Sequence, residues 1–275
     1  MTVAEALADG ERRLEAAGVP TSRVDAEWLV AHALGLSRSE LSASHDRALG
    51  EDEAASVEAL LDRRACREPL AYVLGEWGFR RLTLKVDRRV LVPRPETEVV
   101  VERCLELLRG TEAPAVLDIG TGSGAIALAI ADEHPGARVT AIDVSPGALE
   151  VAEANAAAAG LEVSFELRDV MHGLAGSYDL VVSNPPYVTA AELAALEPEV
   201  RDWEPRIATV GDGHTTTIAV EAAAVLVRGG WLVLEVADGR GEEVAELLRA
   251  TGYEDVRTGA DLAGRDRVVE GRWTR

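Results

Sequence analysis

A chain of 275 residues with a net charge of −20 has room for one large domain and a small one, and its acidity disfavours general affinity for nucleic-acid phosphates. Its 47% hydrophobic and 28% charged residues are typical of a globular protein in water. The N-terminus lacks a continuous apolar core and no apolar run approaches 18 residues, so we expect neither a signal peptide nor a membrane span. Two cysteines without C-x-x-C spacing and five scattered histidines favour a cytoplasmic protein without a bound metal.

Residues 1 to 75 have the apolar spacing of helices. Thr2 and Glu5 form a capping-box pattern at the start of the first, and further helices are expected from Ser22 to Gly35 and over 51–67. This range contains no constellation of catalytic residue types. We therefore predict a small helical domain, 1–75, that recognises a substrate.

The pattern changes to period two over residues 76–94. Leu82, Leu84 and Val86 alternate with polar residues, and a second apolar run follows at 90–92, which predicts a β-hairpin linker. Pro95 suits the first position of a helix, so the next domain is expected to cover 95–275.

Lys and Arg are concentrated near this boundary. From Leu60 to Arg94 there are nine of them against four Asp and Glu, a local charge of +5 in an acidic chain. A solvated face is the simplest interpretation of such a cluster. The alternative hypothesis is that this basic hairpin, together with the helical domain, docks the protein substrate.

From residue 115 onward strands and helices alternate, which predicts a mostly parallel sheet covered by helices on both faces. The last two strands have no helix between them and are expected to pair antiparallel. The predicted strands cover 115–119, 138–142, 163–167, 180–183, 231–236, 255–258 and 267–271. The predicted helices cover 124–133, 146–159, 190–196, 216–227 and 241–251.

A glycine-rich loop follows the first of these strands and opens a helix. Glycines let the backbone approach a ligand closely at the carboxyl ends of parallel strands. Asp143 ends the next strand, where a carboxylate can accept hydrogen bonds from ribose hydroxyls. A nicotinamide or flavin dinucleotide is admissible on this pattern alone, although an acidic residue before the glycines better suits a ligand with a cationic centre. The loop consists of Asp118, Gly120, Thr121, Gly122, Ser123 and Gly124.

A second motif, Asn184-Pro185-Pro186-Tyr187, follows the fourth strand. Two prolines cannot donate backbone hydrogen bonds and hold the chain extended, so the strand has to stop there. The loop offers an amide side chain, carbonyl oxygens and an aromatic ring, which together suit a planar amide or amino group. An ordinary turn is the alternative for these residues taken alone. Asp169, after the third strand, is placed to accept a hydrogen bond from an adenine amino group.

Together these motifs resemble the class I S-adenosylmethionine-dependent methyltransferases that act on planar nitrogens. Further stretches are similar to the release factor glutamine methyltransferases of the HemK/PrmC type: Arg63-Arg64-Ala, 68–75, 91–98, 200–205 and 266–272. The resemblance covers nearly the whole chain. It implies a Rossmann-like α/β sheet of seven strands, mostly parallel with the last antiparallel, joined by a hairpin to a helical bundle.

The resemblance also implies the substrates and the site. The methyl donor would be S-adenosyl-L-methionine, leaving S-adenosyl-L-homocysteine, without a metal. The acceptor would be the glutamine amide of the Gly-Gly-Gln motif of peptide chain release factors, with no nucleic acid or membrane partner. The implied cofactor-binding residues are Asp118, Gly120, Thr121, Gly122, Ser123, Gly124, Asp143, Asp169, Val170 and Asn184.

Within this site the oxygen of Asn184 and the carbonyl of Pro185 would accept the amide N–H groups, Tyr187 would pack on the amide plane, and Pro186 would complete the substrate-binding loop. Asn184, Pro185 and Tyr187 are thus the implied catalytic residues. Val170 departs from the family, in which an aromatic or larger apolar residue is common. Three alternatives stay open: a ribosomal-protein glutamine as substrate, an adenine amino group as substrate, and a non-catalytic cofactor- or nucleotide-binding module.

Overall fold

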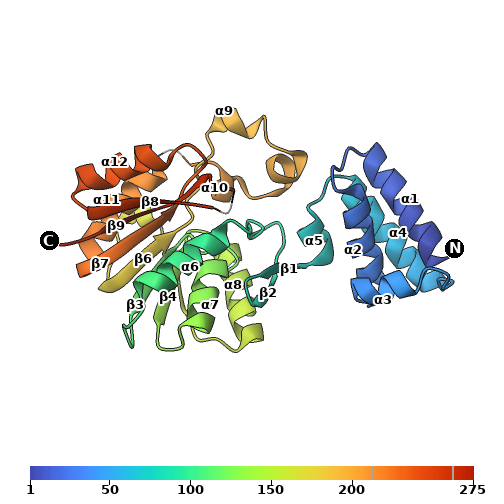
Figure 1. Cartoon of the computed structure of the whole chain (residues 1–275), viewed down its shortest axis with the longest axis horizontal. Helices are drawn as coiled ribbons and strands as arrows, with labels where there is room; N and C mark the ends of the chain where they lie inside the picture. The colour runs from blue at the N-terminus through green and yellow to red at the C-terminus, as the bar shows by residue number, and fades with distance from the viewer. Residues whose placement is uncertain (212, 262) are drawn as a thin grey trace. The chain divides into compact units, whose positions relative to one another are not determined.

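The structure, a computed structural model, describes residues 1–211, 213–261 and 263–275. These form two compact units (Figure 1). The helical unit comprises Met1–Gly75 and Glu197–Trp203, and the sheet unit comprises Glu76–Leu196 and Glu204–Arg275. The return of 197–203 to the helical unit was not predicted, and the hairpin region belongs to the sheet unit instead of forming a separate linker.

The helical unit is built from α1 (Val3–Ala16), α2 (Ser22–Leu34), α3 (Arg38–Ala43), α4 (Glu51–Ala65), α5 (Leu70–Leu74) and a π-helical turn, η2 (Glu199–Trp203). The predicted capping box of α1 is confirmed, because the Glu5 backbone N–H donates to Thr2 Oγ1 and the Thr2 N–H donates to Glu5. The short helices α3 and α5 were not predicted. The core of this unit consists of buried apolar residues of these helices, including Val3, Leu14, Leu29, Val57 and Leu61.

A buried ion cluster fixes η2 within the helical unit. The Arg64 side chain, which is almost fully buried, donates to Asp25 at 2.7 Å and lies 2.8 Å from Glu199. Arg67 donates to both oxygens of Glu199, at 2.7 and 2.6 Å. Burial alone would raise the pKa of Glu199, but the hydrogen bonds from these two arginines outweigh it, so the pKa is lowered. The cluster therefore holds the 197–203 segment by charge pairing out of water.

The sheet unit begins with a small hairpin, β1 (Glu76–Phe79) and β2 (Leu82–Lys85), and α6 (Thr97–Leu107). Its large sheet has the strand order β5-β4-β3-β6-β7-β9-β8, with β9 antiparallel to both of its neighbours, so the predicted seven-stranded sheet is confirmed. The strands are β3 (Ala115–Ile119), β4 (Arg138–Asp143), β5 (Ser164–Leu167), β6 (Tyr178–Ser183), β7 (Leu226–Glu235), β8 (Glu254–Ala260) and β9 (Asp266–Arg272). The remaining helices are α7 (Ala125–Glu133), α8 (Pro146–Ala159), η1 (Val170–His172), α9 (Ala190–Leu193), α10 (Arg206–Thr209), α11 (His214–Val225) and α12 (Gly241–Thr251).

The two faces of this sheet bury separate cores. Because successive strand residues point to opposite faces, Val116 and Leu180 pack with α6 and α7, whereas Leu117 and Val181 pack with α11 and α12. The near-continuous apolar runs of β3, β6 and β7 follow from this double coverage. Helices lie on both sides of the sheet in Figure 1.

The hairpin pairs different segments from those predicted, because the run at 82–85 pairs with 76–79 and not with 90–92. Its turn lies at Arg80 and Arg81, with Arg80 at a φ of 51°, and 90–92 is not a strand. Instead, the Val92 N–H donates to the carboxylate of Glu204. α6 also begins at Thr97 and not at Pro95. Residues 86–96 therefore form an irregular segment of the sheet unit.

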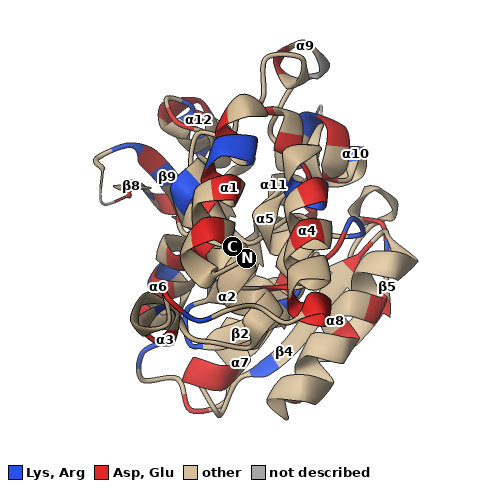
Figure 2. Cartoon of the chain, turned by 90° about the vertical axis from the view of Figure 1, so that its right-hand side faces the viewer, with Lys and Arg blue, Asp and Glu red and all other residues tan. Residues whose placement is uncertain are grey.

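The basic segment is largely neutralised within each unit. Seven of its nine Lys and Arg side chains form ion pairs with carboxylates: 63, 64, 67, 80, 81, 89 and 94. Asp and Glu residues are spread over the helices of both units (Figure 2). The more buried of these arginines, Arg64, Arg67 and Arg80, therefore contribute to the fold, and a docking role for the basic segment stays a hypothesis.

Candidate active site

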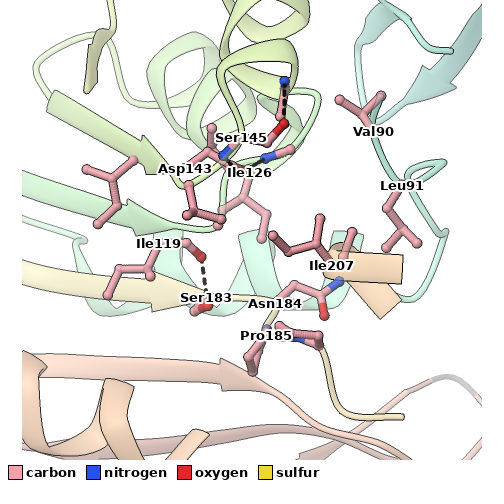
Figure 3. Close-up of a pocket in the computed structure, with 18 of the residues that line it drawn as sticks. Val90, Leu91, Ile119, Ile126, Asp143, Ser145, Ser183, Asn184, Pro185 and Ile207 are labelled. Carbon is pink, nitrogen blue, oxygen red and sulfur yellow. Dashed lines mark hydrogen bonds between the residues drawn. The ribbon is translucent and has the colours of Figure 1, made fainter. Parts of the chain in front are cut away.

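A cavity of about 240 Å³ lies at the carboxyl ends of β3, β4 and β6. These strands are adjacent in the sheet, so the polar residues that follow them meet at one edge. The cavity is lined by 120–123, 143–145, 168–171 and 183–186. In Figure 3, Asp143 and Ser145 lie on one side and Asn184, Pro185 and Ile207 on the other. The structure thus brings most of the predicted site residues together.

The glycine-rich loop leaves open space beside its backbone. Gly120 and Gly122 have φ values of +74° and +57°, and a Cβ built on either would meet no atom within 4 Å. Both line the cavity. The Gly122 N–H donates to Asp143 at 2.9 Å, which ties the loop to the end of β4. A ligand can therefore approach this backbone closely.

Asp118 lies beneath the loop and not in the cavity wall. Its Oδ2 accepts from the Thr121 hydroxyl at 2.7 Å and from the Ala127 N–H at 3.2 Å. Its Oδ1 has no partner among the described residues, and burial raises the pKa of the carboxyl to about 7. Asp118 is not among the residues that line the cavity, and its hydrogen bonds shape the loop; its expected cofactor contact stays a prediction. Gly124 also lies outside the lining, where it starts α7 against Leu128.

The other predicted cofactor residues line the cavity. Asp143 accepts from Ser145 N at 2.9 Å as well as from the glycine loop, and each carboxylate oxygen keeps a lone pair for a ligand. Burial raises the pKa of Asp143, and the backbone hydrogen bonds oppose this shift. Asp169 accepts from the Met171 N–H at 2.8 Å, and the buried Val170 beside it presents an apolar wall. Carboxylate acceptors beside apolar walls suit a nucleoside.

Asn184, Pro185 and Pro186 form the opposite wall. The Asn184 side-chain NH₂ donates to Thr97 Oγ1 at 3.4 Å, and the Thr97 hydroxyl donates to Glu235 at 2.7 Å. Tyr187 is not among the residues that line the cavity, so its packing on a bound amide stays a prediction. Tyr187 is half-buried, and this burial raises the pKa of its phenol to about 12.

Sequence reasoning missed part of the wall. Residues 89–91, Pro93 and Arg94 reach the cavity from the irregular segment before α6. Thr97, Ile207 and His214 reach it from α6, α10 and α11. His214 Nδ1 is buried without a partner among the described residues. The stretch 91–98 was noted only for its resemblance to the family, and the tertiary structure is what places these positions at the cavity. In the described parts of the chain, no group of three His, Cys, Asp or Glu residues could hold a metal, and no helix is long and apolar enough to cross a membrane.

Comparison with known proteins places the chain in a family. The model of the PrmC N-terminal domain matches residues 5–75, and that of the methyltransferase small domain matches 98–198. The release factor glutamine methyltransferase of Geobacter sulfurreducens is 44% identical over 260 residues, which cover 93% of this chain and 91% of that protein. That of Deinococcus radiodurans is 43% identical over 279 residues, 99% of each chain. The chain belongs to the release factor glutamine methyltransferase family.

A comparison with solved structures also agrees with the methyltransferase-like fold of the sheet unit. A methyltransferase from Pyrococcus furiosus superposes with a TM-score of 0.55 at 20% identity, over 70% of this chain and 90% of that one, and shares the fold. The two family models leave 76–97 unmatched. That unmatched stretch nevertheless supplies Thr97 and the wall from Arg89 to Arg94.

Proposed function

We propose that this release factor glutamine methyltransferase family member transfers a methyl group from S-adenosylmethionine to the side-chain amide nitrogen of the glutamine in the Gly-Gly-Gln motif of peptide chain release factors. The observation that carries the proposal is one cavity shared by two motifs. The glycine loop after β3 and the Asn184–Pro186 loop after the adjacent β6 face the same space. Membership of the family supports the choice of acceptor.

The residues present fit the cofactor. We propose that Gly120 and Gly122 lie against its amino-acid part, that Asp143 accepts from the ribose hydroxyls, and that Asp169 accepts from the adenine amino group. The open space beside the two glycines and the acceptor positions on the two carboxylates support this assignment. When bound, S-adenosylmethionine supplies an electrophilic methyl group on a sulfonium centre.

The Gly122→Ala substitution is expected to weaken cofactor binding about tenfold or more. Its φ of +57° is a left-handed conformation that costs a residue with a Cβ about 1–2 kcal/mol, and the added methyl would enter the space beside the loop. Calorimetric titration with S-adenosylhomocysteine measures the effect. Gly160→Ala, at a φ of +66° on the C-terminus of α8, is the matched control for strain alone. Equal affinities of Gly122→Ala and Gly160→Ala would contradict the assigned contact.

The loop after β6 is proposed to activate the acceptor. An amide nitrogen is a weak nucleophile because its lone pair is delocalised into its carbonyl. Hydrogen bonds from its two N–H groups to Asn184 Oδ1 and to the Pro185 carbonyl would orient the lone pair and stabilise the positive charge that develops on nitrogen. The nitrogen gains the methyl group first, and then loses a proton to water, so no strong base is needed before transfer.

An assay with labelled S-adenosylmethionine tests the proposal. A release factor is expected to become labelled, whereas the same factor with the motif glutamine replaced by asparagine is not. A ribosomal protein and an adenine-containing oligonucleotide, assayed in parallel, test the two alternative acceptors. Preferential labelling of either alternative, or no labelling of any acceptor, would overturn the proposal.

We also propose that the helical unit binds the body of the release factor. A single glutamine side chain offers too little contact area to select a whole protein, so recognition of a release factor needs a second surface. Trp28 and Val24 lie one turn apart on α2 and are 41% and 43% exposed. Exposed aromatic residues are frequent anchors of protein interfaces.

Trp28→Ala is therefore expected to raise KM for an intact release factor by about fivefold to tenfold, since truncating an anchor typically costs more than about 1 kcal/mol. KM for a short Gly-Gly-Gln peptide should not change, because the peptide does not reach this surface. Val220→Ala, an exposed position of the sheet unit, is the control. An unchanged KM for the intact factor would refute the role of this surface.

A further inference from the structure

A buried hydrogen-bond chain leads from Glu235 to the cavity. Glu235 ends β7 and is about 1% exposed, and its carboxylate accepts from the hydroxyl of Thr97, the first residue of α6, at 2.7 Å. Thr97, also buried, accepts from the Asn184 side-chain NH₂ at 3.4 Å. Of these three residues, Thr97 and Asn184 line the cavity and Glu235 lies behind them. The proposed chemistry assigns a role to Asn184 alone, so the two residues behind it are unexplained.

The protons available on Glu235, Thr97 and Asn184 determine which group donates in each of these hydrogen bonds. A threonine hydroxyl has one proton to donate, and an ionised carboxylate can only accept. When Glu235 is ionised, the Thr97 proton points to Glu235, and Thr97 can then only accept from Asn184. The group that faces Thr97 must be the NH₂ of Asn184, which leaves its Oδ1 for the cavity. That is the orientation in which Asn184 can accept an N–H from a substrate amide.

We propose that Glu235 and Thr97 are positioning residues that hold the Asn184 amide with its oxygen toward the acceptor glutamine. This inference rests on the proposed function, because it assumes that Asn184 accepts from the substrate. If the Asn184 amide were reversed, its NH₂ would face the NH₂ of the acceptor glutamine, and the hydrogen bond between Asn184 and the substrate would be lost. Glu235 therefore acts through two side chains and does not touch the substrate.

The orientation should depend on pH. Burial raises the pKa of Glu235 to about 7; the hydrogen bond from Thr97 and the charges of Arg267 and Arg94 oppose this shift, and Glu96 adds to it. The phenol of Tyr187 also interacts with Glu235 and stays neutral below its own raised pKa. These groups come from β9, from the segment before α6 and from the loop after β6. When Glu235 is protonated it donates to Thr97, whose own proton then turns toward Asn184 and favours the reversed amide.

The first test compares Thr97→Val with Thr97→Ser. Valine has nearly the shape of threonine but no hydroxyl, and is expected to lower kcat by about tenfold to a hundredfold, because small misplacements of reacting groups have effects of this size. KM for the peptide and calorimetric affinity for S-adenosylhomocysteine should change by less than about threefold. Serine keeps the hydroxyl and should retain most of the wild-type kcat. Equal kcat values for the valine variant and wild type, both folded by circular dichroism, would overturn the proposal.

The second test is the pH dependence of kcat with Glu235→Gln. Wild-type kcat is expected to fall as pH decreases through about 7, and Glu235→Gln should have a lower kcat without this step, because glutamine does not titrate. A step that persists in the variant would overturn the inference. This comparison of wild type with Glu235→Gln tests the positioning role even if Thr97→Val does not fold.

A third readout separates this inference from the proposed function. The ¹⁵N NMR signal of the Asn184 side-chain NH₂ should shift with pH in the wild type and not in Glu235→Gln, even in a protein that methylates no release factor. An active enzyme with a pH-independent signal would contradict the hydrogen-bond chain alone. An inactive enzyme with the expected titration would contradict only the proposed function.

Discussion

Asn184→Ala is expected to lower kcat by about a hundredfold to a thousandfold, the effect of removing one preorganised hydrogen-bonding group from a transition state. Alanine removes the oxygen that accepts the substrate N–H and leaves the Pro185 carbonyl as the remaining acceptor. The affinity for S-adenosylhomocysteine should change far less, because Asp143, the proposed ribose contact, lies on the other side of the cavity (Figure 3). Single-turnover kinetics and calorimetric titration measure the two quantities separately.

Asn184→Asp is the matched variant for this experiment. Aspartate keeps an acceptor oxygen and the size of the side chain, but it cannot donate to Thr97. We expect its kcat to lie between those of wild type and Asn184→Ala. Wild-type turnover in the alanine variant would show that Asn184 does not orient the acceptor.

The second large effect concerns stability. Arg64→Ala is expected to lower the free energy of unfolding by about 3–5 kcal/mol, because removal of one partner from a buried ion cluster leaves the others uncompensated. Asp25 and Glu199 would both lose their contact with Arg64, and Asp25 is itself 3% exposed. Urea denaturation of the full chain, followed by circular dichroism, measures the loss, and hydrogen exchange should locate it in α2, α4 and 197–203.

Arg23→Ala on α2 is the control, since Arg23 is largely exposed and pairs with Glu27 one turn away. Exposed pairs of this kind contribute at most about 1 kcal/mol. The cluster should also weaken in acid. The pKa of Glu199 is lowered in the folded chain, so its contribution is present above its unfolded pKa and is lost as pH falls through the folded value. Equal effects of Arg64→Ala and Arg23→Ala would contradict a structural role for the cluster.

The sheet could be predicted from sequence because its signals are local. Alternating apolar strands and helices, with glycine and proline at their ends, specify the seven strands, and the structure confirms them. The predicted pairing of the hairpin strands was wrong because the turn at Arg80 requires a positive φ in a residue that rarely adopts one. Nothing in the local sequence marks that position as a turn.

The parts of the site that lie in sequence motifs were predicted. The parts that depend on contacts between distant segments were not. Gly120, Gly122 and the Asn184–Pro186 loop follow strands, so their meeting point could be inferred from parallel topology alone. Thr97 and Glu235 come together from positions 138 residues apart, and their hydrogen bond exists only in the folded chain. The burial of Asp118 beneath its loop, and its hydrogen bond with Thr121, likewise could not be read from the motif.

Tandem mass spectrometry of the Gly-Gly-Gln peptide, after incubation of an intact release factor with S-adenosylmethionine and this protein, tests the central claim most directly. We predict that the fragment ions place one added methyl group on the side-chain nitrogen of the motif glutamine, and that Asn184→Ala reduces its yield by about a hundredfold or more at equal times. An unmodified glutamine, or a methyl group on any other residue, would contradict the account.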